Sequence, residues 1–129
     1  MNAAIQALDH EALLAVSDPA IEVHSIFAAV GGAVYHGHEG ARRWLADLDD
    51  AWVEFRIEDE AYFNVGEHTL AYIVLHGRGR QSGAEVVMPY AQVARWQKDR
   101  CVYFKAYHER DDAVKALGVD ADSLDPLGP

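Results

Sequence analysis

The sequence predicts an α+β domain in which helices come first, a curved antiparallel sheet follows and a short helix closes the chain. Residues 9–16 and 38–48 carry apolar side chains at the three- to four-residue spacing of amphipathic helices. Residues 53–108 then hold four strand-like segments separated by polar or glycine-containing turns. Residues 111–118 return to a helical pattern and end at Gly118, a usual residue just after a helix.

Length and composition indicate one soluble domain. The chain has 129 residues, of which 50% are hydrophobic and 25% are charged. No apolar run approaches the roughly 18 residues that a membrane span needs, and the first residues lack the basic start of a signal peptide. We therefore expect a single domain over residues 1–118, a loose tail over 119–129 and a cytoplasmic location. The net charge of −10 argues against nucleic acid as a partner, because a polyanion would be repelled.

The first elements have clear start and stop signals. Asp9 is a good N-cap for the helix over 9–16, and the Asp18-Pro19 pair disfavours its continuation. A strand over 21–25 follows, and Gly31-Gly32 predicts a turn before a short extended segment at 34–35. The helix over 38–48 presents one apolar face, formed by Ala41, Trp44, Leu45 and Leu48.

The sheet is predicted from period-two patterns. Residues 53–65 alternate apolar and polar side chains, which indicates a long antiparallel strand with one polar face. Residues 69–76 are apolar on both faces and indicate a central strand paired with 53–65. The glycines of 77–80 suggest a bulge or a bend. Residues 86–96 and 101–108 form a hairpin around 97–100.

Polar residues at positions expected to be buried predict a pocket. His76, Tyr90, Gln92 and His108 lie on the last three strands, where a plain apolar core would not place them.

Cys101 is a single cysteine among apolar strand residues and is interpreted as a packing residue. The pair His36 and His38 shares a spacing with metal ligands, but the glycine between them marks a turn and no third ligand lies nearby, so we expect no metal.

Four segments together carry a family resemblance. They are DPAIEVHS at 18–25, YHGHEG at 35–40, GRGRQSG at 77–83 and VYFKAYHERDDA at 102–113. In order and spacing they resemble the SnoaL-like branch of the NTF2-like superfamily, which includes polyketide cyclases and ketosteroid isomerases. The resemblance covers about residues 9–118 and implies a cone: a strongly curved antiparallel sheet wrapped around N-terminal helices, with a ligand pocket inside and frequent dimerisation through the outer sheet face.

The resemblance also implies candidate site residues. His24 takes the place of the catalytic aspartate of the isomerases, and Gln92 takes the place of their second carboxyl group. His108 replaces the acid that ends the last strand of the cyclases. Residues 1–16 contain no tyrosine, which departs from the isomerases. Trp44, His76, Met88, Tyr90 and Phe104 are expected to form the pocket wall.

Two hypotheses remain open for the function. In the first, His24 or His108 removes a proton next to a carbonyl group without any cofactor, while Gln92 and Tyr90 hold the enolate oxygen. In the second, the same fold is a non-catalytic ligand-binding or dimeric assembly module. Both predict a small apolar or ring-containing ligand and a homodimer, the latter because apolar central strands would leave an outer sheet face to be covered.

Overall fold

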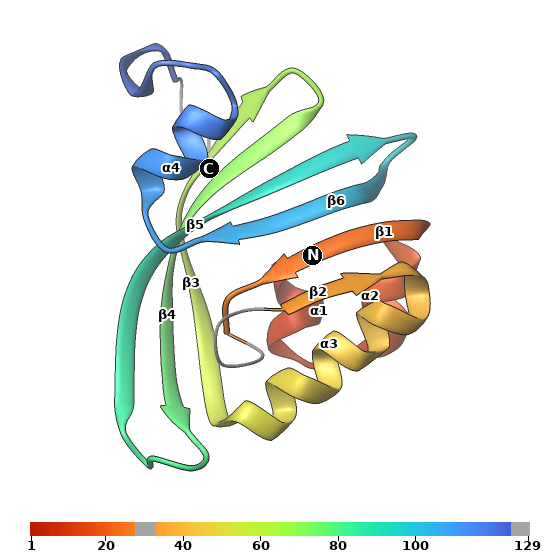
Figure 1. Cartoon of the computed structure of the whole chain (residues 1–129), viewed down its shortest axis with the longest axis vertical. Helices are drawn as coiled ribbons and strands as arrows, with labels where there is room; N and C mark the ends of the chain where they lie inside the picture. Colours follow the sequence, from red (N-terminus) through yellow and green to blue (C-terminus); the bar gives the residue numbers. More distant parts are fainter. Residues whose placement is uncertain (28–32, 125–129) are drawn as a thin grey trace.

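The computed structural model describes residues 1–27 and 33–124 and confirms the α+β class. Six strands form one curved sheet in the order β2-β1-β6-β5-β4-β3. The long strands curve around α1, α2 and α3, and α4 lies on the opposite face of the sheet (Figure 1). In chain order the elements are α1 Asn2–Gln6, α2 His10–Ala15, β1 Ser17–Ser25, β2 Ala33–His36, α3 Gly37–Ala51, β3 Trp52–Val65, β4 His68–Gly79, β5 Glu85–Gln97, β6 Arg100–Tyr107, α4 Arg110–Ala116 and the 3-10 turn η1 Ala121–Ser123.

The strand pairing matches the expectation except at one place. β3 to β6 form an antiparallel meander, and β3 lies beside β4 as predicted. β1 and β2 are also antiparallel, but β1 runs parallel to β6, which corrects the expected antiparallel sheet. The cause is the path of the chain. α3 carries it from β2 at one edge to β3 at the opposite edge, and the meander then returns β6 beside β1 in the same direction.

The helices expected from periodicity are present. The Asp9 carboxylate accepts a hydrogen bond from the Ala12 backbone N–H at 3.1 Å and caps α2. The four apolar residues predicted for α3 are its buried residues. The predicted turn at Gly31-Gly32 lies outside the described residues. None of the helices in residues 1–27 and 33–124 combines the length and apolar character that crossing a membrane requires.

Helix α1 was not predicted, because five residues are too few to show a period. Ile5 is its buried residue. The Asn2 side chain donates to Asp59 and to the Tyr62 hydroxyl, both at 3.2 Å, and the Gln6 side-chain oxygen accepts the Ile57 backbone N–H at 2.7 Å. α1 is therefore fastened to the free edge of β3 and closes one side of the sheet's concave face.

The prediction that residues 53–65 have a single polar face is wrong, because β3 contains a bulge. The pairing with β4 shifts register between Asp59 and Ala61. Before the shift, Phe55 and Ile57 pack toward the helices α1 to α3; after it, Phe63 packs on the opposite face of the sheet. The extra residue, Glu60, reverses the side-chain alternation. One run of alternating residues thus supplies apolar groups to both faces.

Helix α4 covers the outer face where the bulge has turned apolar groups outward. Its Ala113 and Val114 join a cluster of buried residues from β3, β4 and β5. Val119 and Leu124 pack partly buried against the same cluster, so this part of the segment expected as a loose tail is packed. Gly118 follows the helix with φ of 70°, the left-handed conformation that suits its predicted stop.

Arg110 links α4 to the bent part of the sheet. Its guanidinium forms an ion pair with Glu60 at 2.9 Å and donates to the backbone carbonyls of Ile73 at 3.1 Å and Tyr90 at 3.3 Å. It also lies 4.8 Å from the centre of the Tyr72 ring. One cation thus holds the bulge residue and the backbones of β4 and β5 together.

We expect Arg110→Ala to lower the free energy of unfolding by about 1–3 kcal/mol, because it removes hydrogen bonds from a charged donor to backbone carbonyls. Urea denaturation measures this. Arg95→Ala is the control: Arg95 forms an exposed ion pair with Glu67, and its loss should cost about 0–1 kcal/mol. Equal losses in the two variants would show that the Arg110 contacts do not stabilise the bend.

Candidate functional site

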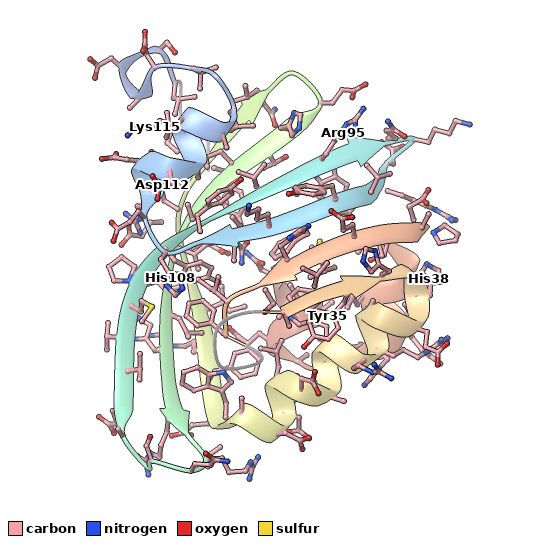
Figure 2. All side chains as sticks on the ribbon, in the orientation of Figure 1. Tyr35, His38, Arg95, His108, Asp112 and Lys115 are labelled. Atoms are coloured by element: carbon pink, nitrogen blue, oxygen red, sulfur yellow. The ribbon has the colours of Figure 1, made fainter. Side chains whose placement is uncertain are left out.

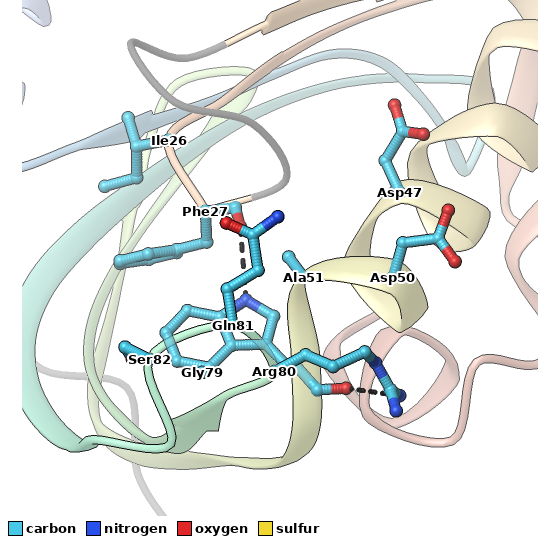
Figure 3. A pocket seen from close by; sticks show the side chains of 10 residues that line it. Ile26, Phe27, Asp47, Asp50, Ala51, Gly79, Arg80, Gln81 and Ser82 are labelled. Atoms are coloured by element: carbon cyan, nitrogen blue, oxygen red, sulfur yellow. Dashed lines mark hydrogen bonds between the residues drawn. The ribbon is translucent and has the colours of Figure 1, made fainter.

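Three hollows adjoin one another on the concave side of the sheet. An open mouth pocket of about 600 Å³ shares Phe27 and Trp52 with a central cavity of about 30 Å³. The central cavity shares Gln92 and Phe104 with a further cavity of about 100 Å³ beside Met1 and Asn2, the α1 cavity. The residues of the mouth pocket, drawn in Figure 3, are Ile26, Phe27, Asp47, Asp50, Ala51, Trp52, Gly79, Arg80, Gln81 and Ser82.

The central cavity is walled mainly by apolar and aromatic side chains. Among its described lining residues there is no carboxylate and no histidine. The indole N–H of Trp44 donates to the Ser25 hydroxyl at 3.0 Å, and the indole N–H of Trp52 donates to the Phe27 carbonyl at 3.1 Å. The full lining is Ile5, Ser25, Phe27, Trp44, Leu48, Trp52, Phe55, Ile57, Leu75, Tyr90, Gln92, Phe104 and Ala106.

Tyr90 and Gln92 form the polar part of this wall. Both lie on β5 with inward-facing side chains, and the Gln92 amide donates to the Tyr90 hydroxyl at 2.9 Å. Burial raises the pKa of Tyr90 well above its usual value, so the hydroxyl keeps its proton and acts as a donor. No described residue accepts that proton or donates to the Gln92 carbonyl oxygen. The pair thus keeps one donor and one acceptor for a further group.

The structure brings four of the predicted site residues together. Gln92, Tyr90, Phe104 and Trp44 all line the central cavity. Phe104 and Trp44 also contact each other, with ring centres 5.3 Å apart. These residues share a signal that sequence can show: each lies in phase with other buried residues of its strand or helix.

His24 does not face the cavity, contrary to the prediction. Ile21, Val23 and Ser25 are the buried residues of its strand, so strand alternation turns His24 to the outer face. There its Nε2 lies 2.6 Å from a Glu22 carboxylate oxygen, and its ring centre lies 5.3 Å from that of Tyr103. The contact lowers the pKa of Glu22, chiefly through the hydrogen bond with His24.

His108 does not face the cavity either. β6 ends at Tyr107, and His108 is exposed where the chain turns toward α4 (Figure 2). The inward alternation of Phe104 and Ala106 therefore stops one residue before it would include His108. A strand predicted one residue too long accounts for this error.

His76 and Met88 are also outside the lining of the central cavity. His76 pairs with Arg56 and Val87 on the outer face, with its Nε2 3.5 Å from a Glu58 carboxylate oxygen. Met88 pairs with Leu75 but is partly exposed. The prediction that these two form the pocket wall is wrong for the central cavity. The side chain of His76 points to the face opposite that of Leu75, and Met88 lies on β5 two residues before Tyr90, outside the lining.

Among the lining residues that sequence reasoning missed, Phe27 and Trp52 are the two that also line the mouth pocket. A signal in the sequence is Gly77, although the glycines of 77–80 predict a bulge or a bend and not a close contact. β4 in fact continues through Gly79, and a Cβ atom at Gly77 would lie 2.8 Å from the Trp52 ring. The glycine therefore makes room for the indole against the strand backbone.

The surroundings of Cys101 and of the pair His36 and His38 suit structural roles. Burial raises the pKa of the Cys101 thiol to about 11, so little of it is thiolate at neutral pH. His38 contacts the Ser17 carbonyl oxygen at 2.8 Å, whereas His36 lies 3.8 Å from Glu22, so the two imidazoles have different surroundings. Within the described ranges no group of three histidine, cysteine or acidic residues is arranged to hold a metal ion.

Comparisons place this architecture among known proteins. A family model for the SnoaL-like domain matches residues 1–104. Among solved structures, an NTF2-like protein of unknown function from Burkholderia pseudomallei has a TM-score of 0.74 at 16% identity, with 92% of each chain covered. None of the curated proteins matches the chain.

Two further solved structures contain small molecules. A hypothetical protein with a ketosteroid isomerase-like fold from Catenulispora acidiphila, in complex with trimethylamine, has a TM-score of 0.74 at 18% identity, covering 94% of this chain and 91% of that one. TerC, co-crystallised with polyporic acid, has a TM-score of 0.72 at 13% identity, with 92% of each chain covered. These likenesses concern the fold.

We expect His24→Ala to raise the pKa of Glu22 toward its ordinary value, because the variant removes the hydrogen bond that lowers it. In the wild type this contact supports the fold above the unfolded-state pKa of Glu22 and is lost as the pH falls through the lowered value. Carboxyl NMR titration measures the change. His36→Ala is the control and should shift the pKa less, since His36 acts only through its charge at 3.8 Å. An unchanged pKa in His24→Ala would contradict this assignment.

Proposed function

The chain belongs to the SnoaL-like domain family, and we propose that it binds a small uncharged ring-containing molecule within its curved sheet. One observation carries the proposal: the central cavity has aromatic walls and a single buried pair, Tyr90 and Gln92, with spare hydrogen-bonding groups. Free hydrogen-bonding groups on an otherwise apolar cavity wall are the usual way in which a pocket orients a ligand. A carbonyl or hydroxyl oxygen on a ring suits the Tyr90 donor.

Charge at the entrance supports an uncharged ligand. Asp47 and Asp50 line the mouth pocket, and the chain carries a net charge of −10. Arg80, the cation of that lining, donates to the backbone carbonyls of Asp49 and Trp52 at 2.9 Å. An anion approaching the mouth would meet two carboxylates and an arginine already engaged, so anionic ligands are disfavoured.

The lining favours binding without proton abstraction. A base that removes a proton next to a carbonyl must lie within hydrogen-bond reach of the substrate. His24 and His108 lie on the outer face and beyond the end of β6. The carboxylates of Asp47 and Asp50 line the mouth pocket, and Asp59, whose charge contributes to the raised pKa of Tyr90, lies beside Asn2; none of the three lines the central cavity. The complexes of TerC with polyporic acid and of the Catenulispora acidiphila protein with trimethylamine are consistent with ligand binding on this fold.

We expect Tyr90→Phe to weaken binding of a neutral ring ketone or phenol by roughly 3- to 10-fold, the usual effect of losing one uncharged hydrogen bond. A thermal-shift screen of such compounds identifies the probe, and isothermal titration calorimetry measures its affinity. Tyr72→Phe is the matched control, because Tyr72 packs with the cluster under α4 on the other face. If every hit binds Tyr90→Phe as tightly as the wild type, the polar pair does not recognise the ligand.

We also propose a homodimer through the outer face of β3, β4 and β5. Although α4 covers part of that face, Val87 remains 67% exposed beside a groove of about 360 Å³. The groove carries Arg56 and Arg78 together with Glu54 and Glu85. Mixed charges around an apolar residue suit a two-fold contact, in which the same surface meets itself.

Val87→Asp is expected to shift the protein from a dimer to a species of 14.3 kDa, because it would bury a carboxylate in the contact. Multi-angle light scattering at micromolar concentration measures the mass. Val34→Asp, at an equally apolar position that is 51% exposed on β2 at the far edge of the sheet, should leave the mass unchanged. A wild type that is monomeric at this concentration would refute the dimer.

A further inference from the structure

The central cavity is too small for the proposed ligand unless a side chain moves. Its volume of about 30 Å³ is well below the roughly 150 Å³ of an engineered apolar cavity that binds benzene. The mouth pocket next to it holds about 600 Å³. Phe27 and Trp52 line both hollows and therefore form the wall between them. Displacement of one of these rings would join the two spaces.

Trp52 is held in place from two sides. Its indole N–H donates to the Phe27 carbonyl at 3.1 Å, the hydrogen bond drawn as a dashed line at Phe27 in Figure 3. Its ring also lies so close to Gly77 that a Cβ atom there would be 2.8 Å away. Moving the indole would break a hydrogen bond and leave the glycine uncovered. Trp52 is thus the fixed half of the wall.

Phe27 is held differently. Its carbonyl accepts a hydrogen bond from Trp52, whereas its ring is held by packing against two core clusters and by edge contacts, 4.8 Å from the ring centre of Tyr90 and 6.4 Å from that of Trp52. The side chain is partly exposed. A change of its side-chain rotamer therefore breaks no hydrogen bond and leaves the backbone in place. Phe27 is the movable half of the wall.

We propose that the Phe27 ring occupies the position of the ligand's ring and must swing toward the mouth pocket before a ligand enters. This inference rests on the proposed function. An aromatic ring that replaces Phe27 regains the edge contact with Tyr90 and also brings an oxygen to the Tyr90 hydroxyl. The preferred ligand is accordingly a neutral, planar, single-ring compound with one oxygen acceptor, and Phe27 determines specificity by competing with it.

Acetophenone serves as the probe, because it has one ring, one carbonyl oxygen and no charge. Phe27→Ala should bind it about tenfold more tightly than the wild type, since no internal ring has to be displaced. Titration calorimetry gives the affinity. The ¹⁵N–¹H signal of the Trp44 indole reports the location, because Trp44 lines the central cavity.

Phe63→Ala is the matched control. It removes the same ring from the cluster under α4, on the opposite face, and should keep wild-type affinity and leave the response of the Trp44 signal unchanged. Phe27→Leu, which keeps an apolar side chain but no ring, should show a smaller gain. It replaces the alanine variant in the test if circular dichroism shows that Phe27→Ala is unfolded.

The outcomes separate this inference from the proposed function. If acetophenone shifts the Trp44 signal equally in the wild type and the Phe27 variants, with equal affinity, the interior binds ligand but Phe27 does not compete. If the signal does not respond in any of them at millimolar probe, the proposed function itself is overturned. Tighter binding by Phe27→Ala together with a Trp44 shift, while Phe63→Ala keeps the wild-type affinity and Trp44 response, supports both.

Discussion

The bulge at Glu60 is the constraint on which both packed faces of the sheet depend. Without the extra residue, Phe55, Ile57 and Phe63 would all project to the same side. With it, the first two close the concave interior and the third joins the cluster that α4 covers. Glu60 itself forms the ion pair with Arg110, so the residue that reverses the strand also anchors the helix that covers the outer face.

The two faces of the sheet differ in the kind of polar side chains that they carry. In the central cavity, the polar groups are the Ser25 hydroxyl, the indole N–H groups of Trp44 and Trp52, which have partners, and the Tyr90 and Gln92 pair, in surroundings that strengthen a hydrogen bond to a partner. On the outer face, histidines lie beside acidic residues, as His24 does with Glu22 and His76 with Glu58. No histidine or carboxylate is among the described residues that line the central cavity, and the proposal of a neutral ligand rests on this difference between the faces.

Local pattern was enough to predict most elements and part of the site. Trp44, Phe104 and Gln92 are in phase with buried neighbours, and the cavity contains them. The same rule could have excluded His24, since Ile21 and Val23 set the inward phase of β1. His108 depended on a strand end known only to within a residue or two.

Other features depend on contacts distant in sequence. The bulge is hard to recognise in residues 53–65, because Asp59 is the single interruption of the apolar positions from Val53 to Val65, and a reversal of faces becomes visible only when both sides of the sheet are covered. The parallel pairing of β1 with β6 follows from the path through α3, which no local pattern encodes. α1 is fastened by side chains that reach β3, more than fifty residues away in sequence.

Because Gly77 contacts the Trp52 ring, the residues at these two positions are expected to change together in evolution. Any side chain at position 77 would collide with the indole, so it could be accepted only together with a smaller residue at position 52. Such a paired exchange would remove the fixed half of the wall and open the interior to larger molecules. Relatives with a side chain at 77 and a small residue at 52 would then be expected to hold multi-ring compounds, and this pair of positions offers a criterion for sorting the family by ligand size.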